Sequence, residues 1–155
     1  VGDALSVPVS WLTDVPRAIA VTAAASASVY AATGDGRKAA LPGAAVALAS
    51  AVHVASSLVV GRARPSIERI GTRQVTSSYP SGHVGAATAQ GVALAMLVAG
   101  LPPARRRLAR AACLAYPLAV GWSRLYTGQH YVTDCVAGFV NGAACASLAR
   151  RVTGA

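Results

Sequence analysis

The stretch VGAATAQGVALAMLVAGL, residues 84–101, contains no charged residue and decides what kind of protein this is. It follows Tyr79-Pro80-Ser81-Gly82-His83 and approaches the roughly 20 apolar residues that cross a bilayer as a helix. Four more apolar runs lie at about residues 18–33, 41–60, 109–122 and 135–149, and Arg110 is the one charged residue among them. Five such runs in 155 residues predict an all-α protein, a polytopic transmembrane helical bundle with about five spans.

The composition agrees with this prediction. The chain is 54% hydrophobic, has a mean hydropathy of +0.49 and is 12% charged, against about 25% charged in an ordinary soluble domain. Its net charge of +9 comes with only 5% aromatic residues, and its arginines form short clusters between apolar runs, which argues against a nucleic-acid-binding module. The alternative of a soluble helical bundle requires helices with a charged outer face, and the runs lack one.

The basic residues predict an orientation. The clusters at residues 37–38, 105–110 and 150–151 fall on one side of an alternating five-span topology, and short loops rich in Lys and Arg stay in the cytoplasm. The loops 61–82 and 123–134 then face outward. We therefore expect one plasma-membrane domain over residues 1–155, with an outer lead-in at 1–17 and a core at 18–151.

Three stretches in the outer loops carry candidate functional residues. Gly61-Arg62-Ala63-Arg64-Pro65 offers guanidinium groups, which either bind phosphate or extend to lipid headgroups. Tyr79-Pro80-Ser81-Gly82-His83 precedes a helix whose free N–H groups favour an anion; there Ser81 is either a phosphate ligand or an N-cap residue. In residues 123–134, His130 and Asp134 are four apart, so one helical turn places them on one face, close to Arg124.

In order and spacing, these stretches resemble the signature of the type 2 phosphatidic acid phosphatase superfamily, which also contains bacterial acid phosphatases and vanadium-dependent haloperoxidases. The resemblance covers about residues 37–151. Because members of the family commonly have six spans, it also implies a sixth span upstream of Val1. It implies a phosphatase that needs no metal and no cofactor and works through a phosphohistidine: His130 attacks phosphorus, Asp134 orients His130, and His83 protonates the leaving oxygen. The phosphate oxygens would be held by Arg64, Arg124, Ser81 and the N–H of Gly82.

The resemblance fails at one position. The family usually has lysine seven residues before the arginine of its Arg-Pro pair, and here Ser57 stands there. We expect Arg62 to supply the missing charge. The implied substrate is a lipid phosphate, such as a polyprenyl diphosphate, phosphatidic acid, phosphatidylglycerol phosphate or a polyprenyl-phosphosugar phosphate, and the implied partners are membrane lipids, not nucleic acid. A catalytically weak or idle lipid-phosphate binding or transport protein and a vanadate-dependent haloperoxidase are the alternatives.

The remaining notable residues receive structural interpretations. His53 lies alone in an apolar run and is predicted to pack or to form a structural hydrogen bond. Gly138 and Gly142 form a GxxxG pattern that predicts close packing against another helix of the same chain. The three cysteines lie in apolar runs and are predicted to act as small hydrophobic residues.

Overall fold

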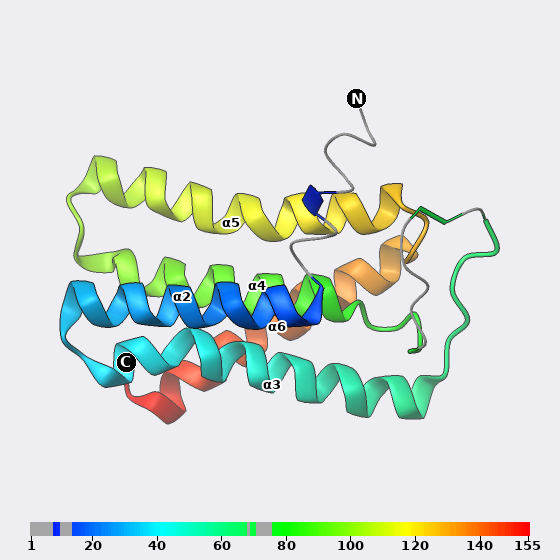
Figure 1. Cartoon of the computed structure of the whole chain (residues 1–155), viewed down its shortest axis with the longest axis horizontal. Helices are drawn as coiled ribbons and strands as arrows, with labels where there is room; N and C mark the ends of the chain where they lie inside the picture. Colours follow the sequence, from blue (N-terminus) through cyan, green and yellow to red (C-terminus); the bar gives the residue numbers. More distant parts are fainter. Residues whose placement is uncertain (1–7, 10–13, 68, 71–75) are drawn as a thin grey trace.

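The structure is a computed structural model that describes residues 8–9, 14–67, 69–70 and 76–155. Every element in this part of the chain is helical, so the all-α prediction is confirmed. The helices run side by side along the long axis and are joined at the two ends of the bundle (Figure 1). They are α2 (Val15–Thr33), α3 (Gly36–Val60), α4 (Gly82–Leu97), the short 3-10 helix η1 (Val98–Gly100), α5 (Pro103–Tyr126) and α6 (Val132–Thr153).

Local sequence signals set the helix ends. Asp35 caps α3 because its carboxylate accepts the backbone N–H groups of Arg37 and Lys38. Gly34 and Gly61 end α2 and α3 with φ values of 65° and 59°, a left-handed conformation that glycine adopts without steric cost. Helix α2 begins at Val15, three residues before the predicted run, so the predicted boundary of the lead-in was too late.

Four described helical segments are long and apolar enough to cross a membrane: α2, α3, residues 82–100 and α6. Helix α5 corresponds to the fourth predicted run, because residues 109–122 form most of its length. The arginine cluster at 105–110 lies in the first two turns of this helix and not in the loop that its charge predicts. Large apolar side chains such as Leu58 and Val140 point outward, as lipid-facing residues do. The chain is an integral membrane protein.

Helix α4 lies at the centre of the bundle and contacts α3, α5 and α6. Its close approach to α6 depends on glycine: a Cβ atom at Gly138 would lie 2.8 Å from the carbonyl oxygen of Ser81, and one at Gly142 would lie 2.6 Å from the Cβ of Thr88. The prediction that the GxxxG pattern packs within the chain is therefore confirmed. Cys135 and Cys145 are buried in the small-residue core, as predicted.

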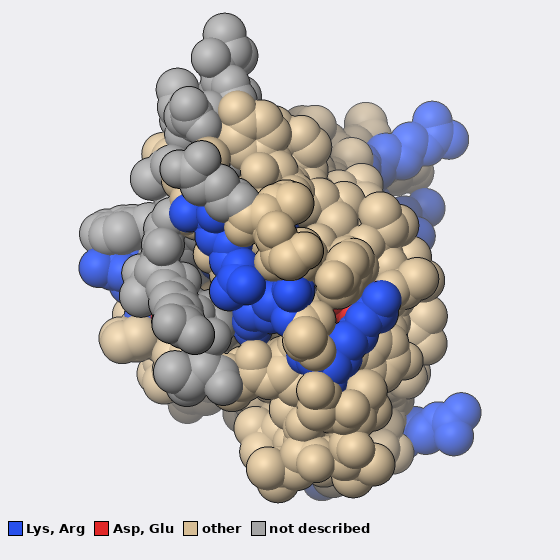
Figure 2. Space-filling model, turned by 90° about the vertical axis from the view of Figure 1, so that its right-hand side faces the viewer, with Lys and Arg blue, Asp and Glu red and all other residues tan. Residues whose placement is uncertain are grey.

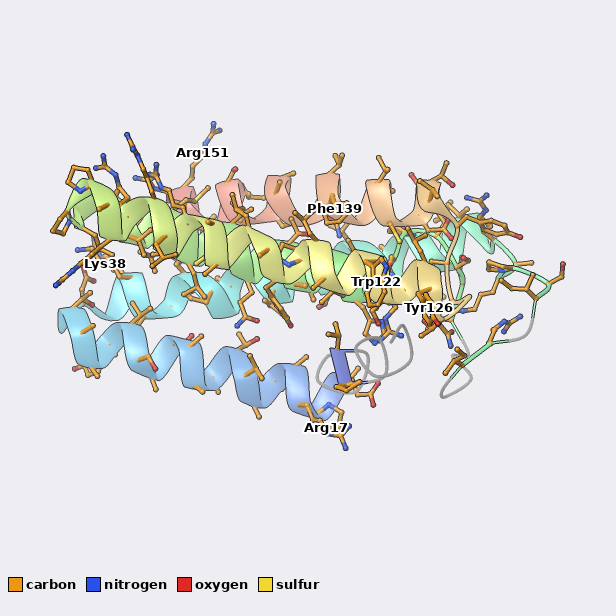
Figure 3. The ribbon with its side chains drawn as sticks, turned by 90° about the horizontal axis from the view of Figure 1, so that it is seen from above. Arg17, Lys38, Trp122, Tyr126, Phe139 and Arg151 are labelled. Atoms are coloured by element: carbon orange, nitrogen blue, oxygen red, sulfur yellow. The ribbon has the colours of Figure 1, made fainter. Side chains whose placement is uncertain are left out.

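The two ends of the bundle differ in charge and chemistry. Lys38 and Arg151 lie at one end and Trp122 and Tyr126 toward the other (Figure 3). The joints α2–α3 and α4–α5 and the end of α6 lie at the first end, so the three basic clusters share one side as predicted. The loops before α4 and α6 lie at the opposite end, where the candidate site is found. Trp11 and Arg73 lie outside the described residues.

Candidate active site

The three sequence stretches meet at the end of the bundle that carries the loops before α4 and α6. The backbone N–H of Ser81 donates to the carbonyl of Asp134 at 3.0 Å, and the N–H of Ser78 donates to the carbonyl of Arg62 at 2.8 Å. Arginine side chains gather in the middle of this end (Figure 2). Segments that are far apart in the sequence thus form one basic site.

His130 has the geometry of a nucleophile. Its Nδ1 lies 2.8 Å from the carbonyl oxygen of Ser78; because a carbonyl only accepts, Nδ1 carries the proton and the lone pair is on Nε2. Nε2 lies 3.3 Å from Nη1 of Arg64. Burial, followed by the charge of Arg64, lowers the pKa of His130 to about 4. The ring is therefore neutral near pH 7, and the lone pair of Nε2, which here accepts from Arg64, is the one that can attack.

Asp134 organises the loop around His130. It is fully buried, and its Oδ1 accepts from Arg62 at 2.8 Å. Its Oδ2 accepts the hydroxyl of Ser78 and, at 2.9 Å, the N–H of Tyr131. The carboxylate lies 3.7 Å from Nδ1 of His130, so the predicted proximity is confirmed but a direct hydrogen bond is not formed.

The predicted single helical turn from His130 to Asp134 is wrong. Helix α6 begins at Val132, so His130 precedes it, and Asp134 occupies the third position of the first turn. From there its side chain folds back on the helix start and reaches the loop through Ser78. Asp134 thus holds the residue whose carbonyl orients His130.

The two arginines of the first stretch have different surroundings. Arg64 lies beside Nε2 of His130 and donates to the carbonyl of Gln129 at 2.9 Å. Its pKa is lowered by burial and by the nearby Arg69, which increases the gain from binding an anion. Arg62 instead bonds Asp134 and covers the ring of Tyr131 at 4.4 Å. Its predicted role as a direct phosphate ligand stays a prediction.

The start of α4 provides hydrogen-bond donors. Ser81 stands at the N-cap position, but its side chain makes no capping bond. Its Oγ is buried and has no hydrogen-bond partner in the described part of the chain. A buried hydroxyl without a partner is costly, and an anion bound here would satisfy it. Gly82 follows directly. Arg124, in the last turn of α5, is 2% exposed.

A cavity of about 330 Å³ opens from these residues into the bundle. Its polar wall is formed by His53, Arg64, Gly82, His83 and His130, together with Ser50 and Thr76. Its apolar wall is formed by Val15, Ala18, Ile19, Val46, Val54 and Ala86. The ring of His83 makes no hydrogen bond to any described residue and is not sealed from the cavity. A site that is basic at one end and apolar at the other suits an amphiphilic anion.

Sequence reasoning missed two residues of the site. His53 was predicted to be structural; its Nδ1 does bond the carbonyl of Pro80 at 2.9 Å, but its ring also lines the cavity. Ser78 orients His130 through a backbone carbonyl, which no side-chain motif reveals. Within the described residues, no group of three or more His, Cys, Asp or Glu side chains is arranged to hold a metal ion.

Comparison with known proteins fits this geometry. The family model of the PAP2 superfamily matches residues 38–155. The chain belongs to the PAP2 superfamily. Its fold is similar to that of a transmembrane PAP2-type phosphatidylglycerolphosphate phosphatase from Bacillus subtilis, known from a crystal structure. The TM-score is 0.85 at 20% sequence identity, and the match covers 98% of this chain and 76% of that one.

LpxE from Aquifex aeolicus is also similar to this PAP2 protein, with a TM-score of 0.68 at 18% identity over 96% of this chain and 85% of that one. At these identities the two structures show the common fold. No curated protein matches the sequence significantly.

Proposed function

We propose that this protein is a lipid phosphatase that hydrolyses a phosphomonoester or diphosphate of a membrane lipid through a phosphohistidine on His130. The observation that carries the proposal is the placement of Nε2 of His130. It holds a lone pair beside Arg64, at the polar end of a cavity whose other walls are apolar. Membership of the PAP2 superfamily and the lipid phosphate named for the Bacillus subtilis protein support it.

The reaction has two steps. Nε2 of His130 attacks phosphorus while the bond from phosphorus to the leaving oxygen breaks, and His83 gives a proton to that oxygen. Water, losing a proton to His83, then cleaves the N–P bond and releases phosphate. Arg64, Arg124, Ser81 and the N–H of Gly82 stabilise the charge on the phosphoryl oxygens, as phosphoryl transfer requires. Asp134 stabilises the positive charge that develops on the ring of His130.

Orientation belongs to the same proposal. The end of the bundle with three basic clusters faces the cytoplasm, so the active site opens on the extracytoplasmic side of the plasma membrane. Recycling of a lipid carrier of the cell envelope suits this side. We expect right-side-out vesicles to hydrolyse a membrane-impermeant phosphate ester and sealed inside-out vesicles not to hydrolyse it. The reverse pattern would contradict the orientation.

The test of the reaction is a panel of lipid phosphates incubated with the purified protein in detergent. The panel contains farnesyl diphosphate, phosphatidic acid and phosphatidylglycerol phosphate, with His130→Ala as the control. We expect phosphate release by the wild type and none by the variant. Absence of release from every substrate would favour the alternative of an idle lipid-phosphate binding protein. Halide oxidation that depends on added vanadate would favour the haloperoxidase alternative.

A further inference from the structure

The cavity contains a histidine that the proposed reaction does not use. His53 lies on α3 and donates from Nδ1 to the carbonyl oxygen of Pro80 at 2.9 Å. Its other nitrogen, Nε2, makes no hydrogen bond to any described residue and is not fully buried. Because the ring lines the cavity, Nε2 is accessible from there.

The position of this ring is built into the site. The ring of His53 occupies the space over Gly82. A Cβ atom added to Gly82 would lie 2.8 Å from Cδ2 and 2.9 Å from Nε2 of the His53 ring. Only a residue without a side chain leaves room for the imidazole at that distance. The glycine next to His83 therefore brings His53 to the start of α4, where the N–H groups of the helix favour an anion.

The ring of His53 lies level with the start of α4, because it bonds the carbonyl of Pro80 and packs over Gly82. On α3, the lining residues Ser50 and Val46 lie further from the end of the bundle that carries His130 and Arg64. A lipid with its terminal phosphate at His130 and its chain against the apolar wall therefore passes the start of α4, where His53 and His83 both line the cavity.

The charges around His53 favour an anion. Arg64 from the loop before α4, His83 from α4 and His130 from the loop before α6 line the cavity with it, while the described part of α2 contributes only apolar side chains there. Among the described residues that line the cavity there is no carboxylate. In the neutral ring Nε2 is an acceptor; after it takes a proton from solvent it donates, and the imidazolium pairs with an anionic oxygen.

From this geometry we propose that His53 binds the second phosphoryl group of a lipid diphosphate, the one that leaves with the lipid when His130 attacks the terminal phosphorus. The inference rests on the proposed phosphatase function and makes its substrate class narrower. A monophosphate of the same lipid has no phosphoryl group at this position. The enzyme therefore prefers diphosphates, and His53 is the source of the preference.

The test compares farnesyl diphosphate with farnesyl monophosphate, which share one chain. His53→Asn keeps an N–H donor near the position of Nδ1 and removes Nε2, whereas His53→Gln keeps an uncharged N–H donor near Nε2. We expect His53→Asn to lower the ratio of the two kcat/KM values, diphosphate over monophosphate, by about ten- to hundredfold, the usual effect of losing one hydrogen bond to a charged group. The ratio for His53→Gln is expected to lie between those of His53→Asn and the wild type.

A purely structural role for His53 gives another pattern. If the ring serves only to hold Pro80, His53→Asn keeps the wild-type ratio while both kcat/KM values fall in His53→Gln, and the inference is overturned. Ser56→Ala is the matched control, because Ser56 also lies on α3 but lines a separate groove shared with α6 and is not among the residues that line the cavity. We expect this variant to keep the wild-type ratio.

Binding of inorganic pyrophosphate and inorganic phosphate, measured by titration calorimetry, separates the inference from the proposed function. We expect pyrophosphate to bind the wild type more tightly, and His53→Asn to lose that difference. If this binding result is obtained but the protein hydrolyses no lipid phosphate, the phosphatase proposal is refuted and the diphosphate-binding role of His53 is retained. The opposite outcome would refute the role of His53 and retain the phosphatase. In that outcome the enzyme hydrolyses lipid phosphates, but His53→Asn keeps both the wild-type ratio of kcat/KM values and the wild-type difference between pyrophosphate and phosphate binding.

Discussion

Replacing Asp134 by asparagine keeps the shape of the side chain and removes its charge. In the structure one carboxylate oxygen accepts from Arg62 at 2.8 Å, and the other accepts from Ser78 and Tyr131. An amide supplies one acceptor and one NH₂ group, so the least disruptive orientation keeps the two bonds to Ser78 and Tyr131. The carbonyl of Ser78 then still accepts from Nδ1 of His130, and the tautomer of the nucleophile is retained.

The loss of rate in this variant is therefore mainly electrostatic. The carboxylate lies 3.7 Å from Nδ1 of His130, whose ring becomes positive as the N–P bond forms. At this distance the attraction between unit charges is about 1 kcal/mol in bulk water and about 4 kcal/mol at an effective dielectric constant of 20. Since each 1.4 kcal/mol changes a rate about tenfold, we expect kcat to fall by roughly tenfold to a thousandfold, with a much smaller change in KM.

The assay is single-turnover release of phosphate from farnesyl diphosphate in detergent, combined with thermal unfolding to show that the variant is folded. Ser78→Ala is the control: it removes the hydroxyl that bonds Asp134 but keeps both the carboxylate and the carbonyl that orients His130. We expect it to lose less activity than Asp134→Asn. A folded Asp134→Asn with a wild-type kcat, or one changed only in KM, would refute this role of the charge.

Three further predictions follow from named contacts. Because the pKa of His130 is about 4 instead of the ordinary 6.5, kcat/KM should fall as the pH drops through about 4, where protonation removes the lone pair; a fall centred near 6.5 would contradict this. Gly142→Ala places a Cβ against α4 and should lower the unfolding free energy by about 1–3 kcal/mol, whereas Gly100→Ala, with open space around it, should not show an overpacking loss. Arg62→Ala should lower kcat by disturbing Asp134 without changing inhibition by phosphate; weaker inhibition would support the direct phosphate contact expected from the sequence.

Much of the architecture could be predicted because membrane helices follow simple rules. Apolar runs with almost no charge located all five long helices, and the basic clusters at residues 37–38, 105–110 and 150–151 grouped at one end as expected. The extent of α5 was underestimated because a charge count places arginines in loops, although their long stems allow them to lie on the first turns of a helix. Hydropathy therefore finds the middle of a helix more reliably than its ends.

The site was only partly predictable for a different reason. Side-chain motifs identified His83, His130 and Arg64, which the fold brings into one cavity. The orientation of His130 by the carbonyl of Ser78 depends on how the loop before α4 folds, and a backbone acceptor leaves no mark in the sequence. His53 stands alone in an apolar run, and only the packing of its ring over Gly82 shows that it reaches the cavity.

The most direct test of the central claim is to look for phosphate on His130. The purified protein is mixed with farnesyl diphosphate labelled in its terminal phosphate, quenched in alkali to preserve phosphohistidine, and digested for mass spectrometry. We expect labelled phosphate on Nε2 of His130 within the first turnover, and no label in His130→Ala. Rapid hydrolysis without label on His130, or label on another side chain, would contradict a phosphohistidine on His130.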